Sequence, residues 1–223
     1  MTSRRGLVAA VLLLLTVLGA CGSEPLPSAS PDLRRLRVVD HVADVAGYDR
    51  SCSSRGQHAC SFGQAWTDAT DVALGRNGCD TRSDILRRDL QDIALKPGSR
   101  ACVVLSGSLT DPYTGHVVEF RRGANPQAVQ IDHVLSLHAS WERGAAAWPL
   151  QRRVDLANDP RNLLATTASV NASKGDRTPQ DWRPPARSGW CTYGRNFYDV
   201  ALAYDLAVTS ADVHALRTML GTC

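Results

Sequence analysis

The stretch that decides the fold reads Val129-Gln130-Ile131-Asp132-His133, a short segment typical of a β-strand that ends in an acid and an imidazole. After a long insertion, residues 162–166 (NLLAT) predict a second strand. Residues 169–175 (SVNASKG), with Ser at the start and Gly at the end, predict a short helix. If the two strands pair and the helix folds across them, polar side chains from all three segments meet. The order strand, long insertion, strand, helix therefore sets the expected fold.

Helices and one β-hairpin are expected around this centre, which gives an α+β class. Ala101 to Leu109 and His116 to Phe120 flank Asp111-Pro112-Tyr113-Thr114-Gly115, where Pro and Gly favour a hairpin turn. Apolar residues recur at helical spacing between Asp80 and Leu95. Further helices are predicted over Ala65 to Leu74, Ser136 to Trp148, Gln151 to Ala157, Asn196 to Ala207 and Thr209 to Leu220, the last with Thr209 and Asp212 as an acidic capping box.

The N-terminal residues have the features of an export signal. Arg4 and Arg5 precede an apolar run from Leu7 to Leu18, which is shorter than the ~20 residues of a membrane-spanning helix. The run ends in LGACG at 18–22, which resembles the bacterial lipobox. Residues 1–20 are thus predicted to be removed and Cys21 to carry a lipid, followed by a flexible tether over 21–32. We expect a protein anchored on the extracytoplasmic face of the cell membrane, with a soluble secreted protein as the alternative.

The remaining residues, 33–223, are expected to form a single domain with its core at 128–177. Their even number of cysteines in an exported chain predicts three disulfides. Pairing between neighbours in the sequence is preferred because each bridge closes a modest loop, and C-x-x-C spacing for a metal–thiolate site is absent. The expected pairs are Cys52 with Cys60, Cys79 with Cys102, and Cys191 with Cys223.

The composition excludes several classes of protein. With 43% hydrophobic and 21% charged residues, the chain is an ordinary globular mixture rather than a disordered, collagenous or coiled-coil sequence. Its 25 Lys and Arg residues nearly balance 22 Asp and Glu residues, which excludes a polycation that coats nucleic acid. From Asp132 to Arg195 there are nine bases and six acids, so a mild positive surplus surrounds the predicted centre.

The polar residues of the predicted centre suggest metal-assisted chemistry. Asp132 and the side-chain carbonyl of Asn171 are oxygen ligands of the kind that a hard divalent cation prefers. His133 has a reference pKa near ~6.5, so it can be neutral and basic at working pH and take a proton from water. Asn162 brings a second amide to the same place.

Three ordered motifs carry a resemblance to a known family. They are IDHV at 131–134, ANDPRNLLA at 157–165 and NASKGD at 171–176. In this order they resemble the HNH endonuclease superfamily, built on a ββα-metal (His-Me finger) core, and especially exported proteins similar to the C-terminal nuclease domain of GmrSD-type restriction enzymes. Further matching marks extend the resemblance from about Trp66 to the C-terminus: Cys79-Asp80-Thr81-Arg82, Asp111 to Gly115, Gly144-Ala145 with Trp148, Cys191 and Cys223.

The resemblance implies a role for each matching residue. His133 would be the general base and Asp132 a metal ligand, while Asn162 would hold His133 in place by hydrogen bonding. Asn171 would be the second ligand, at a position where many relatives have histidine, and this change favours Mg²⁺ or Mn²⁺ over Zn²⁺. Lys174 would contact a phosphate.

The chemistry implied is hydrolysis of a nucleic-acid backbone. The metal would polarise the phosphodiester while His133 activates water, and the product would carry a 5′ phosphate. Arg161 and Arg177 are candidate phosphate contacts, which give affinity without reading bases. Further candidates are Arg143, Arg152, Arg153, Arg183 and Arg187. Asp80-Thr81-Arg82 is interpreted as a helix cap with an arginine ion pair at the border of the cleft.

We therefore predict a monomeric, membrane-tethered nuclease acting on DNA, with RNA as a second candidate substrate and little sequence specificity. One alternative is a catalytically silent surface lipoprotein that uses the scaffold to bind a partner. The intact set of Asp132, His133, Asn162, Asn171 and Lys174 argues against it, because a silent relative is expected to have lost at least one. Another alternative is a metal hydrolase acting on a different phosphodiester.

Overall fold

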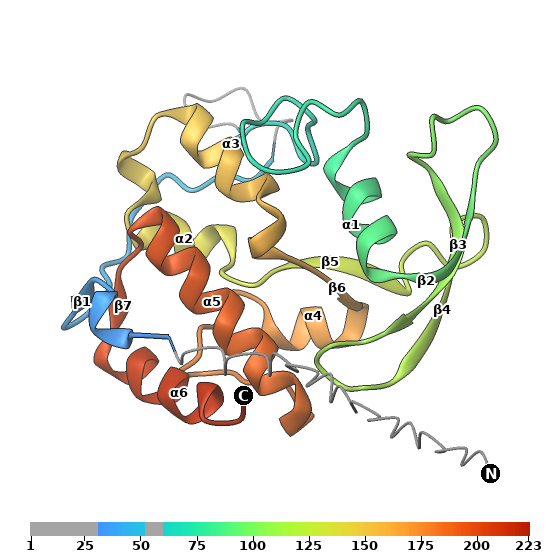
Figure 1. Cartoon of the computed structure of the whole chain (residues 1–223). Coiled ribbons are helices and arrows are strands. Elements are labelled where there is room, and N and C mark those ends of the chain that lie inside the picture. The colour runs from blue at the N-terminus through green and yellow to red at the C-terminus, as the bar shows by residue number, and fades with distance from the viewer. Residues whose placement is uncertain (1–30, 52–59) are drawn as a thin grey trace, which may run out of the picture.

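Two antiparallel strands and one helix lie at the centre of the computed structural model, which describes residues 31–51 and 60–223 (Figure 1). Strand β5 (Val129–His133) pairs with β6 (Leu163–Thr167) over their full lengths, with Val129 opposite Thr167 and His133 opposite Leu163. Helix α4 (Ala168–Lys174) follows β6 directly and contacts both strands. It ends at Gly175, whose φ of 52° favours glycine. The predicted order of strand, insertion, strand and helix is confirmed.

The other elements surround this centre and make the fold α+β. Helix α1 and helix α4 lie on opposite sides of the β5–β6 ribbon (Figure 1). The elements before β5 are η1 (Leu33–Arg35), β1 (Val38–Val39), α1 (Thr81–Asp89), β2 (Gln91–Leu95), β3 (Val104–Thr110) and β4 (Val117–Arg121). The insertion between β5 and β6 holds α2 (Leu137–Glu142), η2 (Ala145–Ala147), α3 (Leu150–Asn158) and η3 (Pro160–Asn162). After α4 come η4 (Arg187–Gly189), α5 (Trp190–Tyr204), β7 (Val208–Thr209) and α6 (Ser210–Leu220).

A second sheet, in the order β2-β3-β4, corrects part of the helix prediction. The β3–β4 hairpin around 111–115 is confirmed, but the helix expected from Asp80 to Leu95 stops at Asp89. The residues after it form β2, because Ile93 and Leu95 satisfy a strand alternation as well as a helical spacing. Pairing with β3, such as Leu95 with Val104, decides between the two.

The helix expected over Ala65 to Leu74 is also wrong, because this segment consists of turns. Trp66 and Leu74 both have positive φ, which no α-helix accommodates. Short polar side chains accept hydrogen bonds from backbone N–H groups of these turns instead. The carboxylate of Asp68, for example, accepts hydrogen bonds from the N–H groups of Asn77 and Gly78 at 3.0 and 2.9 Å.

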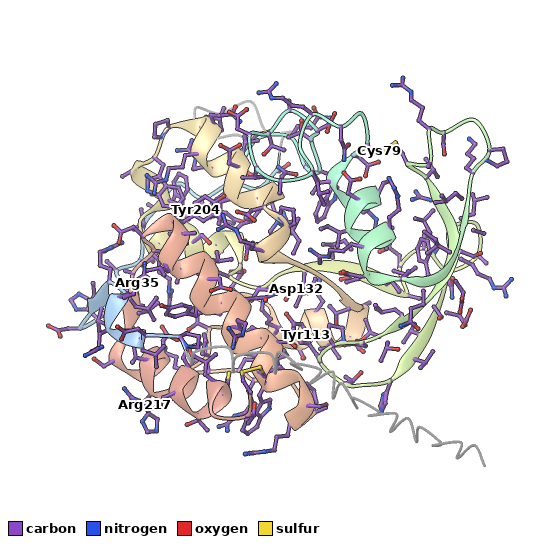
Figure 2. All side chains as sticks on the ribbon, viewed as in Figure 1. Arg35, Cys79, Tyr113, Asp132, Tyr204 and Arg217 are labelled. Carbon is purple, nitrogen blue, oxygen red and sulfur yellow. A yellow bond between two sulfur atoms is a disulfide. The ribbon has the colours of Figure 1, made fainter. Side chains whose placement is uncertain are left out.

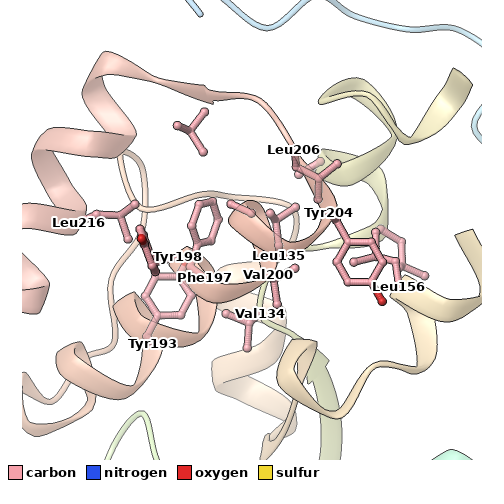
Figure 3. Close-up of a cluster of buried hydrophobic side chains, with 14 of the residues drawn as sticks. Val134, Leu135, Leu156, Tyr193, Phe197, Tyr198, Val200, Tyr204, Leu206 and Leu216 are labelled. Atoms are coloured by element: carbon pink, nitrogen blue, oxygen red, sulfur yellow. The ribbon is translucent and has the colours of Figure 1, made fainter. Parts of the chain in front are cut away.

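Two clusters of buried apolar side chains hold the molecule together. The larger one gathers around α5, where Tyr193, Phe197 and Val200 pack against Val134 and Leu135, the residues directly after β5 (Figure 3). The smaller one lies between α1 and the β5–β6 ribbon. The end of β5 is therefore packed from both sides, which fixes the backbone at Asp132 and His133.

The helix that ends the described chain is capped as predicted. The Thr209 side chain accepts from the N–H of Asp212, and the Asp212 carboxylate accepts from the N–H of Thr209, completing the capping box. The same Asp212 is fully buried and accepts a hydrogen bond from Arg143 at 3.3 Å, which ties α6 to the end of α2. Arg143, one of the predicted phosphate contacts, is thus an internal structural residue.

Two of the three expected disulfides are confirmed, namely Cys79–Cys102 and Cys191–Cys223. The expected pairing of Cys60 with Cys52 lies outside the described residues, as do the signal segment, Cys21 and most of the tether. Within the described ranges, no helix is both long and apolar enough to cross a bilayer.

Candidate functional site

A cavity of about 370 Å³ opens beside the end of β5 and brings the predicted residues together. Asp132 and His133 line it from β5, and Asn171 lines it from α4. The acid, the imidazole and the amide, distant in sequence, therefore share one space. Arg50, Trp66 and Arg82 complete its wall from segments earlier in the chain.

Asp132 and His133 contribute to the site from opposite faces of β5, because successive strand residues alternate. His133 lies on the side of Trp66, whose ring is stacked on the imidazole with centroids 5.7 Å apart and planes 16° apart. Asp132 lies on the side of α4 and of the hairpin residue Tyr113. The site therefore separates an imidazole side from a carboxylate side.

The hydrogen bond of His133 defines which of its nitrogens is basic. Its Nε2 lies 2.9 Å from the carbonyl oxygen of Ala157, at the end of the insertion. A carbonyl oxygen only accepts hydrogen bonds, so Nε2 must carry the proton and Nδ1 is left with its lone pair. The ring is thus oriented by Ala157 on one edge and by Trp66 on one face.

The surroundings of His133 keep it neutral. Burial, followed by the nearby positive charge of Arg50, lowers the pKa of His133 from its usual 6.5 to about 3. The hydrogen bond to Ala157 offsets part of this effect, while Lys174 adds to it. At neutral pH the imidazole is therefore uncharged, and it carries only the Nε2 proton.

Asp132 is held by a buried ion pair. Its Oδ1 accepts a hydrogen bond from Lys174 Nζ at 2.8 Å, and its Oδ2 accepts one from the Tyr113 hydroxyl at 2.8 Å. Lys174 also donates to the carbonyl oxygen of His133 at 2.7 Å and is completely buried. Figure 2 shows Tyr113 close to Asp132 at the centre of the molecule. The Lys174 ammonium, for which a phosphate contact was expected, is thus bound to Asp132 in this arrangement, and Lys174 does not line the cavity.

Asn162 positions the chain beyond His133 rather than the imidazole itself. Its side-chain oxygen accepts from the N–H of Leu135 at 2.9 Å, and its amide nitrogen donates to the carbonyl of Leu135 at 3.1 Å. Its backbone carbonyl accepts from the N–H of Val134 at 2.8 Å. The predicted hydrogen bond to His133 is replaced by this pairing, which fixes the end of β5 through the backbone.

The oxygen atoms on the carboxylate side fit a hard divalent cation. The Asn171 amide nitrogen donates to Gln130 at 2.8 Å, and in the described part of the chain its oxygen has no hydrogen-bond donor. A carboxylate has about four lone-pair sites, so Asp132 keeps acceptor capacity beside Lys174 and Tyr113. No cluster of three or more His, Cys, Asp or Glu residues is found among residues 31–51 and 60–223. Two protein ligands plus water suit Mg²⁺, which usually keeps several waters.

The arginines predicted to bind substrate lie elsewhere. Arg161 is paired with Asp159 at 2.6 Å, and Arg177 donates to the backbone carbonyl of Ser173. Neither lines the cavity, where Arg50 and Arg82 stand instead. Arg82 belongs to a motif noted in the sequence, but Arg50 precedes every motif that resembles the nuclease family and had no local signal.

The chain belongs to the family described as GmrSD restriction endonucleases, C-terminal domain, whose model matches residues 80–214. The match includes β5, β6 and α4, while Arg50 and Trp66 precede it. A protein of Arthroderma benhamiae (strain ATCC MYA-4681 / CBS 112371), described as an uncharacterized secreted protein, is 42% identical over 147 residues, which cover 65% of this chain and 68% of the relative. No solved structure matched the chain.

Replacing Lys174 by Met is expected to lower the free energy of unfolding by about 3–5 kcal/mol, because it leaves the buried Asp132 carboxylate without its cation. Urea titration followed by circular dichroism measures this loss. The double variant Lys174→Met/Asp132→Leu is expected to lose less, since no buried charge then lacks a partner. A single variant as stable as the wild type would contradict the buried ion pair.

Replacing His133 by Asn is expected to flatten the dependence of stability on pH. The folded-state pKa of about 3 lies below the unfolded value of ~6.5, so the unfolded state binds more protons between them. The stabilisation is complete above pH ~6.5 and is lost as pH falls toward 3, by up to about 1.4 kcal/mol per pH unit. Urea unfolding at a series of pH values should therefore give a steeper slope for the wild type. His214→Asn, on the exposed face of α6, controls for the loss of a histidine, and equal slopes for wild type and His133→Asn would rule out a buried neutral imidazole.

Proposed function

We propose that this protein is a metal-dependent HNH-type endonuclease that hydrolyses phosphodiester bonds of DNA, and of RNA as a second candidate. The observation that carries the proposal is a neutral imidazole, with an unprotonated Nδ1, on the wall of a cavity that Asp132 and Asn171 also line. Membership of a restriction-endonuclease domain family supports it. In this proposal β5, β6 and α4 are the ββα-metal core.

His133 acts as the general base in this mechanism. Its Nδ1 accepts a proton from the attacking water, and the fixed Nε2–H bond to Ala157 keeps the ring in the required tautomer. Asp132 and Asn171 would hold Mg²⁺ or Mn²⁺, which supplies charge stabilisation at the phosphate when bound. Lys174 is a positioning residue that orients Asp132, and Asn162 is a positioning residue that orients the end of β5.

A silent binding scaffold is the competing proposal. A buried, neutral histidine could serve packing alone. However, packing does not require the same cavity to hold two oxygen ligands and two arginines. The arrangement therefore favours an enzyme over a scaffold.

We further propose that the protein works outside the cytoplasm as a monomer, attached to the cell membrane through a lipid on Cys21. The description of the fungal relative as secreted supports export. The Cys79–Cys102 and Cys191–Cys223 disulfides fit an oxidising surrounding. The lipid anchor rests on the sequence at 18–22 alone.

Purified protein without residues 1–21 is expected to nick plasmid DNA in Mg²⁺ or Mn²⁺ and to stop when EDTA is added. His133→Asn should reduce the rate by about 10²–10⁴-fold, because it removes the general base. Agarose gels of a supercoiled plasmid measure nicking, and a small bis-phosphodiester measures hydrolysis independent of nucleic-acid binding.

Each result separates the candidates. Cleavage by His133→Asn at the wild-type rate would refute the assigned base. Inactivity of the wild type on DNA, RNA and the small diester with either metal would favour the silent scaffold. Activity on the small diester alone would indicate another phosphodiesterase.

Cys21→Ser in the full chain is expected to move the protein from the membrane fraction to the medium, because the lipid-bearing sulfur is lost. Immunoblots of the two fractions measure the distribution. Ser23→Ala, two residues beyond, is the matched control and should leave the protein with the membrane. Persistent membrane association of Cys21→Ser would show that the anchor is something else.

A further inference from the structure

Arg50 and Arg82 are the two arginines on the wall of the His133 cavity, and both have uncommitted donors. Arg50 is exposed, and in the described part of the chain it has neither an ion-pair partner nor a hydrogen bond. Other arginines near the centre are engaged, as Arg88 is with Asp89 at 2.6 Å. A free guanidinium beside a catalytic cavity is a natural anion contact.

Arg82 is fixed in place without being neutralised. Its Nη2 donates to the carbonyl oxygens of Val129 at 3.0 Å and Pro126 at 3.3 Å, and its pKa is lowered, chiefly by burial. The ion pair expected with Asp80 is absent from the described contacts, because the Asp80 carboxylate caps α1 at Ser83. Arg82 therefore keeps its charge uncompensated, with Nε and Nη1 as free donors of a preorganised fork.

The two arginines mark the two ends of β5. Arg82 is anchored at Val129, where the strand begins. Arg50 lines the cavity together with His133, where the strand ends. Arg50 and His133 also line a smaller adjoining cavity of about 50 Å³. Four strand steps separate these ends by ~13 Å, since each residue advances a strand by about 3.3 Å. Arg82 and Arg50 therefore approach the cavity from the start and from the end of the strand.

The negative charges in the same cavity do not cancel this pair. Asp132 is neutralised by Lys174 at 2.8 Å. Asp176 lies 3.3 Å from His138 and is largely exposed. The cavity wall thus has two cationic side chains, Arg50 and Arg82, besides the imidazole of His133.

We infer that Arg50 and Arg82 bind two different backbone phosphates of a nucleic-acid strand that runs along β5, with Arg50 at the phosphate next to His133 and Arg82 at a more distant one. The inference rests on the proposed nuclease function and deepens it. A polymeric strand can contact both arginines, whereas a small diester held at His133 reaches only Arg50. The site is therefore built for an oligonucleotide rather than for a small phosphodiester.

The test compares two substrates and two variants. Arg82→Gln is expected to raise KM for a short DNA oligonucleotide by about tenfold and to leave hydrolysis of the small diester within about twofold of wild type. Arg50→Gln is expected to impair both substrates. Arg217→Gln, on exposed α6 at the lower edge of the molecule in Figure 2, is the matched control and should change neither.

Binding is measured separately from catalysis, by the fluorescence anisotropy of a labelled oligonucleotide. The protein carries His133→Asn and the buffer contains EDTA, so that the oligonucleotide is not cleaved. Each arginine variant should weaken binding about tenfold and reduce the slope of log Kd against log salt concentration by about 1. Arg82→Lys keeps the charge but not the fork, so it should restore the salt slope more than the affinity. Circular dichroism verifies that each variant folds, and Arg50, which makes no hydrogen bond or ion pair within residues 31–51 and 60–223, supplies the test if Arg82→Gln does not fold.

The outcomes distinguish this inference from the proposed function. Oligonucleotide cleavage and binding by Arg50→Gln and Arg82→Gln at wild-type levels would overturn the inference while leaving the nuclease intact. Equal losses for Arg82→Gln on both substrates would overturn the assignment of a distant phosphate. Failure of the wild type to cleave or bind any nucleic acid would instead refute the proposed function.

Discussion

The buried ion pair between Lys174 and Asp132 is the interaction on which the rest of the site depends. It joins Lys174, the last residue of α4, to Asp132, near the end of β5, at 2.8 Å, and both side chains are buried. Burying two charges costs free energy unless each is fully hydrogen-bonded. Lys174 meets this condition by also binding the carbonyl of His133, and Tyr113 meets it for the second carboxylate oxygen. Any shift of α4 along the ribbon would break both contacts of Lys174, with Asp132 and with the carbonyl of His133, together.

This constraint allows two neighbouring residues to have different chemistry. Asp132 is paired with an ammonium on one face of β5, while His133 is kept neutral on the other face, chiefly by burial, and is stacked against Trp66. Alternation along the strand separates the groups, and the open end of the ribbon lets both reach one cavity. The fold thus provides a base and a pair of oxygen ligands from a strand of ordinary geometry.

Local sequence patterns predicted the elements that local interactions determine. The β5 and β6 strands, α4 with its Gly175 stop, the hairpin and the capping box at Thr209 were all accessible in this way. Gln91–Leu95 was not, because its strand state is decided by pairing with β3, and the turns after Ala65 depend on side chains binding distant backbone. Likewise, the motif residues predicted where the site lies, but they did not predict which charged side chains pair with each other inside it. That Lys174 faces inward, and that Arg50 reaches the cavity, follow from long-range packing that no spacing rule encodes.

The Cys191–Cys223 bond closes α5, β7 and α6 into one covalent loop. α5 supplies much of the main apolar cluster, which packs directly behind the end of β5. Asp205, which lies in the connection between the two helices, is exposed and so is accessible to proteases. A single cut there leaves the two fragments joined by the disulfide. The apolar cluster behind the end of β5 therefore stays together, whereas the same cut would release α6 from a chain without this bond.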